Sequence, residues 1–219
     1  MKWRCSVVLM IAILCAKGVT QVEPDVNSVL DHRIAKFDLT DATVIDGFSK
    51  LSMQLIPGLH LGIEEILRAV SPDVPTPSVK FSLNLQNATV REILDSLCER
   101  DNRYQWAVDG ATINVFPQDS LHDATFFLNK NISLLELNGV PSPEEALTPL
   151  ARILPGEQLG YAGVGGDSSY AQPWTTKFGD VTVRQFLNRT SEHMGPLGGW
   201  ILHGSKDQRF FFFFNFGFH

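Results

Sequence analysis

Hydrophobic and polar residues alternate most regularly over residues 79–85, where every second residue is apolar. This period of two predicts a strand with one buried face and one wet face. Apolar residues then return at helical spacing over residues 90–98. Thr89 can cap this helix, and Glu92 follows three residues later, as in a capping box. Two β-rich runs on either side of Asp109-Gly110 predict a hairpin. The segment as a whole therefore predicts one strand, one helix and two further strands.

A simpler unit of the same kind precedes this segment. Residues 34–39 alternate as a strand does, and residues 44–55 show helical spacing that ends at Pro57-Gly58. Residues 59–63 alternate again and predict a second strand. A proline-rich connector over residues 71–77 leads into the next unit.

The C-terminal part of the chain repeats this arrangement. Six residues recur in kind, four of them at a spacing of 93 residues and two at 94. The pairs are Thr89 and Thr182, Val90 and Val183, Arg91 and Arg184, Leu94 and Leu187, Trp106 and Trp200, and Gly110 and Gly204. A spacing held across several residue types indicates duplication of one unit. We therefore predict an α+β fold of two tandem βαβ–βαββ modules, with the helices packed on one side of small sheets.

The first residues have the pattern of a secretory signal peptide. Two basic residues lie among the first four, an apolar stretch covers residues 7–16, and small residues occur at Ala16 and Gly18. The apolar stretch is shorter than the roughly 20 residues that a membrane span needs. We therefore expect a signal peptide over 1–18, with the mature chain beginning near Val19 or Gln21 in the periplasm or outside the cell.

The predicted domains follow from these boundaries. A leader segment over residues 19–35 connects the signal peptide to the first module, which covers residues 36–119. Residues 120–219 form the second, divergent copy of the module. No membrane span is expected in the mature chain.

Loss of the signal peptide changes the charge and the cysteine content. The formal net charge is −6, and losing Lys2, Arg4 and Lys17 would bring it to −9. A chain this acidic repels phosphate backbones, which argues against nucleic acid as a partner. Cys98 would be the only cysteine left, so an intramolecular disulfide is excluded. Lipidation of Cys15 is disfavoured, because Leu14 occupies the position where lipoprotein signals have a small residue.

The stretch Phe81-Ser82-Leu83-Asn84-Leu85-Gln86-Asn87-Ala88-Thr89-Val90-Arg91-Glu92-Ile93-Leu94 and the hairpin around Asp109-Gly110 resemble the secretin/TonB short N-terminal domain. The resemblance covers about residues 36–118, and the second copy shares it only through the internal repeat. It implies a small periplasmic domain of the bacterial cell envelope that makes protein–protein contacts, and it brings no catalytic residues. Unlike such proteins, this chain is expected to have neither a secretin pore nor a receptor barrel after the second module.

Residues suited to catalysis or metal binding show no recognisable pattern. No two of the six histidines stand four residues apart, the spacing that places two ligands on one helix face. The chain has no G-x-S-x-G motif, and the glycine-rich residues 160–166 fit no phosphate-binding pattern. We therefore predict no catalytic, cofactor-binding or metal-binding residues.

The remaining candidates for function are the edges of the predicted sheets. Ser82 and Asn84 lie on the wet face of the strand over 79–85, and Phe212 and Phe214 belong to an unusual phenylalanine run over 210–214. That run fits either a buried strand or an exposed docking edge. The leading hypothesis is that the protein is a non-catalytic interaction module of the cell envelope. Its expected partners are envelope proteins, and its expected role is that of an accessory to a secretin-like or TonB-dependent assembly. The alternatives are an exported enzyme with a site between the modules and a self-assembling envelope subunit.

Overall fold

The computed structural model describes residues 25–54, 60–65, 78–154, 159–165, 173–193, 198–204 and 209–215. The predicted signal peptide lies outside these residues. The first half of the fold consists of α1 (Val26–Leu30), β1 (Arg33–Ala42), α2 (Val44–Gln54), β2 (His60–Glu64), β3 (Phe81–Thr89), α3 (Val90–Arg100), β4 (Tyr104–Asp109) and β5 (Thr112–Pro117). The second half consists of the 3-10 turn η1 (Phe127–Asn129), β6 (Asn131–Val140), α4 (Pro143–Ile153), β7 (Leu159–Gly165), β8 (Trp174–Thr182), α5 (Val183–His193), β9 (Gly198–Gly204) and β10 (Arg209–Asn215). No helix in the described ranges is both long and apolar enough to cross a membrane.

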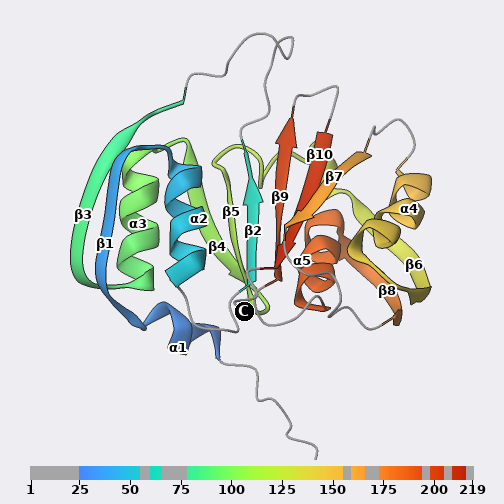
Figure 1. Ribbon diagram of the computed structural model, residues 1–219. Helices are drawn as coiled ribbons and strands as arrows, with labels where there is room; N and C mark the ends of the chain where they lie inside the picture. Colours follow the sequence, from blue (N-terminus) through green and yellow to red (C-terminus); the bar gives the residue numbers. More distant parts are fainter. Residues whose placement is uncertain are drawn as a thin grey trace, which may run out of the picture.

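The two halves share one central sheet. Six strands pair in the order β4-β5-β2-β9-β10-β7, so that β2 of the first half lies beside β9 of the second. Two antiparallel ribbons, β1–β3 and β6–β8, flank this sheet. In Figure 1 the helices α2 and α3 lie between the β1–β3 ribbon and the central sheet, while α5 lies between that sheet and the β6–β8 ribbon. The α+β class predicted from the sequence is confirmed.

Corresponding strands of the two halves pair in the same register, which establishes the repeat in three dimensions. The β1–β3 ladder shifts register between Leu39 and Ala42, and the β6–β8 ladder shifts at the matching place, between Leu137 and Val140. Each irregular position has a left-handed backbone in both copies, since φ is 49° at Asp41 and 59° at Gly139. The bulge therefore belongs to the repeated unit and not to one copy alone.

Local side-chain chemistry begins α3 and its counterpart α5 in the same way. The side chain of Glu92 accepts the backbone N–H of Thr89 at 2.7 Å and completes a capping box with the Thr89 hydroxyl. These hydrogen bonds, the backbone one above all, hold the pKa of Glu92 below its ordinary value. Gln185 accepts the N–H of Thr182 at 3.0 Å in the second copy. The prediction that residues from Val183 onward form a helix is thus confirmed.

The helices of the two halves cover opposite faces of the central sheet. Leu61 and Ile63 of β2 belong to the first hydrophobic core, against which Ile201 of β9 also packs. Trp200 and Leu202, the neighbours of Ile201, belong to the second core. Since successive side chains of a strand point to opposite faces, the two cores lie on the two sides of one sheet. This fusion of the sheets places β2 at the centre of the molecule and leaves β4 and β7 at the ends of the pairing order.

Candidate functional site

The junction between the halves is a parallel pairing of β2 with β9. Gly62 lies opposite Trp200 in this ladder, and Ile63 lies opposite Ile201. The backbone N–H of Glu65 donates to the carbonyl of Leu202 at 3.0 Å. At the junction, a strand of the first half therefore extends the sheet of the second half by pairing with its edge strand.

Gly62 is required by the close approach of the Trp200 indole. A Cβ atom at position 62 would lie 2.7 Å from Cε2 and Cζ2 of Trp200 and 2.6 Å from Oδ1 of Asn114. Ordinary contacts between carbon atoms are about 3.5–4.0 Å. Only glycine therefore allows the Trp200 indole to lie this close to the backbone of β2.

A buried ion pair adds charge to this junction. Nε of Arg184, at the start of α5, donates to Oε1 of Glu64 at 2.5 Å, and the hydroxyl of Ser120 donates to Oε2 at 3.1 Å. The two charged side chains are only 7% and 1% exposed. Burial raises the pKa of Glu64 above its ordinary value, while the hydrogen bond and charge of Arg184 act in the opposite direction. The pair ties the two halves together, and breaking it would leave an uncompensated buried charge.

The helix α5 also contacts the β4–β5 hairpin of the first half. Asn188 accepts the indole N–H of Trp200 at 2.9 Å and donates to the carboxylate of Asp109 at 3.0 Å. The hydroxyl of Thr112 donates to Glu192 at 3.1 Å. The side of α5 that faces the central sheet therefore contacts strands of both halves.

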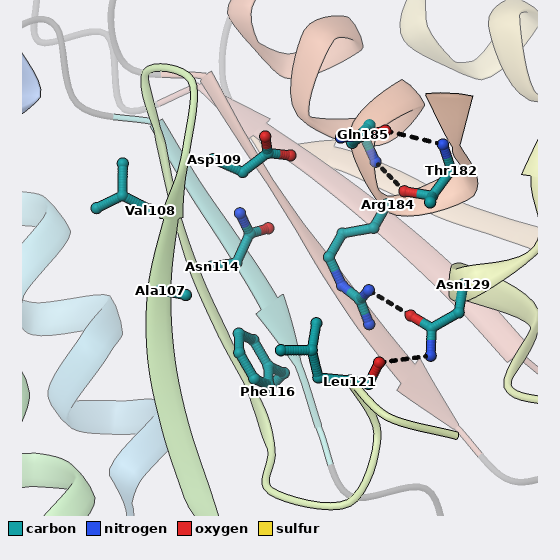
Figure 2. A pocket seen from close by; sticks show the side chains of 10 residues that line it. All are labelled: Ala107, Val108, Asp109, Asn114, Phe116, Leu121, Asn129, Thr182, Arg184 and Gln185. Carbon is teal, nitrogen blue, oxygen red and sulfur yellow. Dashed lines mark hydrogen bonds between the residues drawn. The ribbon is translucent and has the colours of Figure 1, made fainter. Parts of the chain in front are cut away.

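A cavity of about 410 Å³ lies beside the ion pair. In Figure 2 the guanidinium of Arg184 extends from α5 toward the space between Asn114 and Asn129. Nη1 of Arg184 donates to Oδ1 of Asn129 at 2.5 Å, but Nη2 of Arg184 and Oδ1 of Asn114 have no hydrogen-bond partner among the described residues. The cavity is lined by Ala107, Val108, Asp109, Asn114, Phe116, Leu121, Asn129, Thr182, Arg184 and Gln185.

The first half presents the same surface, and no strand in the described ranges pairs with it on that side. The indole N–H of Trp106 donates to Asp95 at 2.8 Å, as that of Trp200 donates to Asn188. The guanidinium of Arg91, the counterpart of Arg184, lies 5.8 Å from the centroid of the Trp106 ring. We call the surface formed by Arg91, Asp95, Trp106 and Val108 the open face.

Burial differs sharply between the two equivalent surfaces. Trp200 and Leu202 are completely buried, and Arg184 is 6% exposed. By contrast, Val108, the counterpart of Leu202, is 39% exposed, and the side chain of Arg91 is also exposed. Arg91 makes no ion pair with any residue that the structure describes, whereas Arg184 pairs with Glu64. The open face thus has the residues of a docking surface, and no described strand covers it as β2 covers the equivalent surface of the second half.

Main-chain groups of β4 point away from the sheet at the open face. The N–H of Gln118 donates to the carbonyl of Arg103 at 2.8 Å, which fixes the alternation of the antiparallel β4–β5 ladder. Ala107 then bonds to β5, while Trp106 and Val108 direct their N–H and C=O groups outward. These two residues correspond to Trp200 and Leu202, whose groups face β2.

The structure places some of the residues proposed from the sequence on an edge strand and others on a strand that is paired on both sides. Ser82 and Asn84 are exposed on β3, whose only described strand partner is β1. The Ser82 hydroxyl accepts the N–H of Asp41 at 3.3 Å. The edge predicted at Phe212 and Phe214 is wrong, because β10 pairs with β9 on one side and β7 on the other. A run of apolar residues identifies a strand but does not identify its neighbours.

Sequence reasoning missed the residues of the open face as a site. Arg91 and Trp106 were used only as markers of the repeat, although their recurrence as Arg184 and Trp200 was the available signal. Within the described part of the chain, no three histidine, cysteine or acidic side chains gather closely enough to bind a metal ion.

Comparisons with protein-family models, curated proteins and solved structures find no match to this chain. The likeness of residues 36–118 to the secretin/TonB short N-terminal domain therefore stays a prediction from the sequence.

Proposed function

We propose that this protein is an exported, non-catalytic protein-interaction module of the bacterial cell envelope, and that it captures an extended segment of a partner on the edge of β4. One observation carries the proposal. The equivalent edge of the second half, β9, is paired with β2 of the first half, whereas β5 is the one partner of β4 among the described strands. The described part of the chain thus contains one occupied and one open copy of the same edge.

The chemistry of β4 suits the addition of a strand. Outward N–H and C=O groups at Trp106 and Val108 can form a ladder with an extended peptide, as in other cases of β-augmentation. Edge strands that avoid such pairing commonly contain lysine, proline or a bulge. The sequence of β4 has no lysine and no proline, and its ladder with β5 is regular. The edge is therefore left suitable for pairing.

The location in the envelope rests on the sequence. The basic and apolar pattern over residues 1–18 supports export, and the resemblance of residues 36–118 supports a periplasmic accessory of a secretin-like or TonB-dependent assembly. Envelope proteins are accordingly the partners we propose.

Capture from envelope extract by two variants tests the proposal. Val108→Pro removes an outward N–H and leaves the ladder to β5 intact, whereas the matched control Val108→Ala shortens the same side chain and keeps the N–H. We expect Val108→Pro to lose a partner that the wild type and Val108→Ala both retain, with an unchanged urea unfolding transition. Equal capture by both variants would refute a role for this edge. Loss of capture in a folded Asn84→Pro variant alone would move the binding edge to β3.

A second candidate function follows from the cavity between the halves. Nη2 of Arg184 and Oδ1 of Asn114 are buried polar atoms without partners, and such atoms commonly mark a bound ligand or ordered water. A small ligand or substrate with an acidic group that accepts from Nη2 of Arg184 and a hydroxyl group that donates to Oδ1 of Asn114 would make the protein a ligand-binding protein or an exported enzyme. Thermal shifts with a panel of small carboxylates and phosphates test this function. A shift that Asn114→Leu abolishes would support it, and no shift with any of them would exclude these ligands.

A further inference from the structure

We infer that the open face binds an acidic extended segment of another protein, which runs parallel to β4 and has a glycine opposite Trp106 and a carboxylate two residues later, facing Arg91. The inference rests on the proposed function, because it takes β4 as the binding edge. It goes further by naming the chemistry of the segment.

The template for this segment is β2 as it lies on β9. There Gly62 is opposite Trp200, and Glu64, two residues later, reaches Arg184. The strand runs parallel to β9 and pairs with the outer edge of that strand. The N–H of Glu65 at its end donates to the carbonyl of Leu202. A segment bound to β4 in the same way would meet equivalent side chains in the same order.

The correspondence between the two surfaces is close in contacts as well as in sequence. Arg91 and Asp95 stand 93 residues before Arg184 and Asn188, and Trp106 stands 94 residues before Trp200. Both indoles donate to the residue at the same helix position, at 2.8 Å and 2.9 Å. The Trp106 indole is thus already held in the orientation in which Trp200 accepts β2.

The close contact between Gly62 and the Trp200 indole indicates that the bound segment needs a glycine opposite Trp106. A Cβ atom at Gly62 would lie 2.7 Å from the Trp200 ring, so a side chain at that position would force the strand away from the tryptophan. With Trp106 in the matching orientation, a partner residue larger than glycine would meet the same obstacle.

The charge of Arg91 on the open face indicates that the bound segment carries a carboxylate. Arg91 is exposed and makes no ion pair with the described residues, while its counterpart holds Glu64. The replacement of Asn188 by Asp95 puts a negative charge further along α3. The open face therefore attracts an acid at the Arg91 end of the segment and repels one at the Asp95 end, which sets its direction as well as its composition.

A second copy of this chain is a poorer occupant. Its equivalent of β2 is β7, which has Gly165 at the position of Glu64 and so offers no carboxylate. The β7–β10 ladder also shifts register between Phe211 and Phe213, so β7 does not present the regular strand that β2 does. We therefore assign the open face to a different protein.

A labelled peptide with the sequence of residues 58–66 serves as the probe, because it contains the glycine and glutamate of the template. Fluorescence anisotropy with the full chain should show saturable binding. A Gly62→Val peptide should bind at least roughly tenfold more weakly because of the steric clash. A Glu64→Lys peptide should bind about fivefold or more weakly because it places two positive charges together.

The decisive variant is Arg91→Glu, with Arg152→Glu on an exposed part of α4 as the matched control. We expect Arg91→Glu to reverse the preference, so that it binds the Glu64→Lys peptide better than the parent peptide. Arg152→Glu should keep the wild-type preference. Absence of peptide binding, or an unchanged preference in Arg91→Glu, would overturn the inference.

The outcomes separate this inference from the proposed function. Loss of partner capture by Val108→Pro together with an unchanged peptide preference in Arg91→Glu would retain the binding edge and reject the acidic segment. Normal capture by Val108→Pro would reject the edge itself. Concentration-dependent oligomers in sedimentation velocity that Val108→Pro abolishes would show that a second copy occupies the open face, and would refute the assignment to a different protein.

Discussion

Replacing Gly62 with alanine should destabilise the protein, because the new methyl group would enter space already filled by the Trp200 indole. The ideal Cβ lies 2.7 Å from two ring carbons and 2.6 Å from Oδ1 of Asn114, roughly 1 Å inside ordinary contact. Trp200 is completely buried and Asn114 nearly so, which leaves little room for either to move. Overpacking of this kind costs about 1–3 kcal/mol of stability.

The alanine also brings a smaller gain, since it restricts the unfolded chain by about 0.5–1 kcal/mol relative to glycine. The net loss should therefore be about 1–2 kcal/mol, equivalent to a Tm lower by roughly 2–8 °C for a chain of this length. Urea unfolding followed by tryptophan fluorescence would measure it as a lower midpoint at an unchanged slope.

Gly179→Ala is the matched control. A Cβ there would have Ser133 O as its nearest neighbour, at an ordinary 3.6 Å. This variant should be as stable as the wild type or slightly more so. The same midpoint for Gly62→Ala and the wild type would refute the packing of β2 against Trp200, and with it the template used for the open face.

Three further predictions concern buried ionisable groups. Arg184→Met should cost about 3–5 kcal/mol in urea unfolding at neutral pH, since Glu64 loses its buried partner, and an unchanged midpoint would contradict the ion pair. Because burial raises the pKa of Glu64, the folded state binds its proton more readily than the unfolded state does. Stability should therefore fall as the pH rises above about 4.5 through the folded pKa, and Glu64→Gln should flatten this slope in unfolding curves measured from pH 4 to 8. Burial, aided by nearby Asp95 and Asp101, raises the pKa of Cys98 to about 12. Iodoacetamide at pH 8 should then label the native protein far more slowly than the urea-unfolded protein, and equal rates would contradict that environment.

The sequence predicted those parts of the fold that depend on local signals. The capping box at Thr89 is present as predicted, and the alternation holds over residues 81–85, because each depends on neighbours a few residues apart. The strand starts later than predicted, at Phe81, and Val79 is exposed. The repeat was visible because duplication preserved Thr182 and Trp200 at a fixed spacing. These signals also predicted the order of strands and helices from β1 and β6 onward, but they did not predict α1, which lies in the predicted leader segment.

The joining of the halves could not be predicted from the same signals. Gly62 and Glu64 look ordinary in the sequence, and they acquire their roles only from Trp200 and Arg184, more than a hundred residues away. Periodicity states which face of a strand is buried but not which strand lies beside it. The misplaced edge at Phe212 has the same cause, since the parallel pairing of β10 with β7 depends on distant parts of the chain.

The head-to-tail joining of the two halves explains why an open edge exists at all. Two copies of a unit that pair through different edges leave one edge of each kind without the other copy, and among the described strands these are the outer edges of β4 and β7. A second molecule could continue the series unless one of these edges resists pairing. The register shift in the β7–β10 ladder interrupts the regular strand at one end, whereas the β4–β5 ladder has no such interruption. Because the edge of β4 is regular while that of β7 is irregular, the β4 edge is better suited to a different protein than to a second copy of this chain. Arg91 beside the β4 edge supplies the positive charge by which such a partner can be selected.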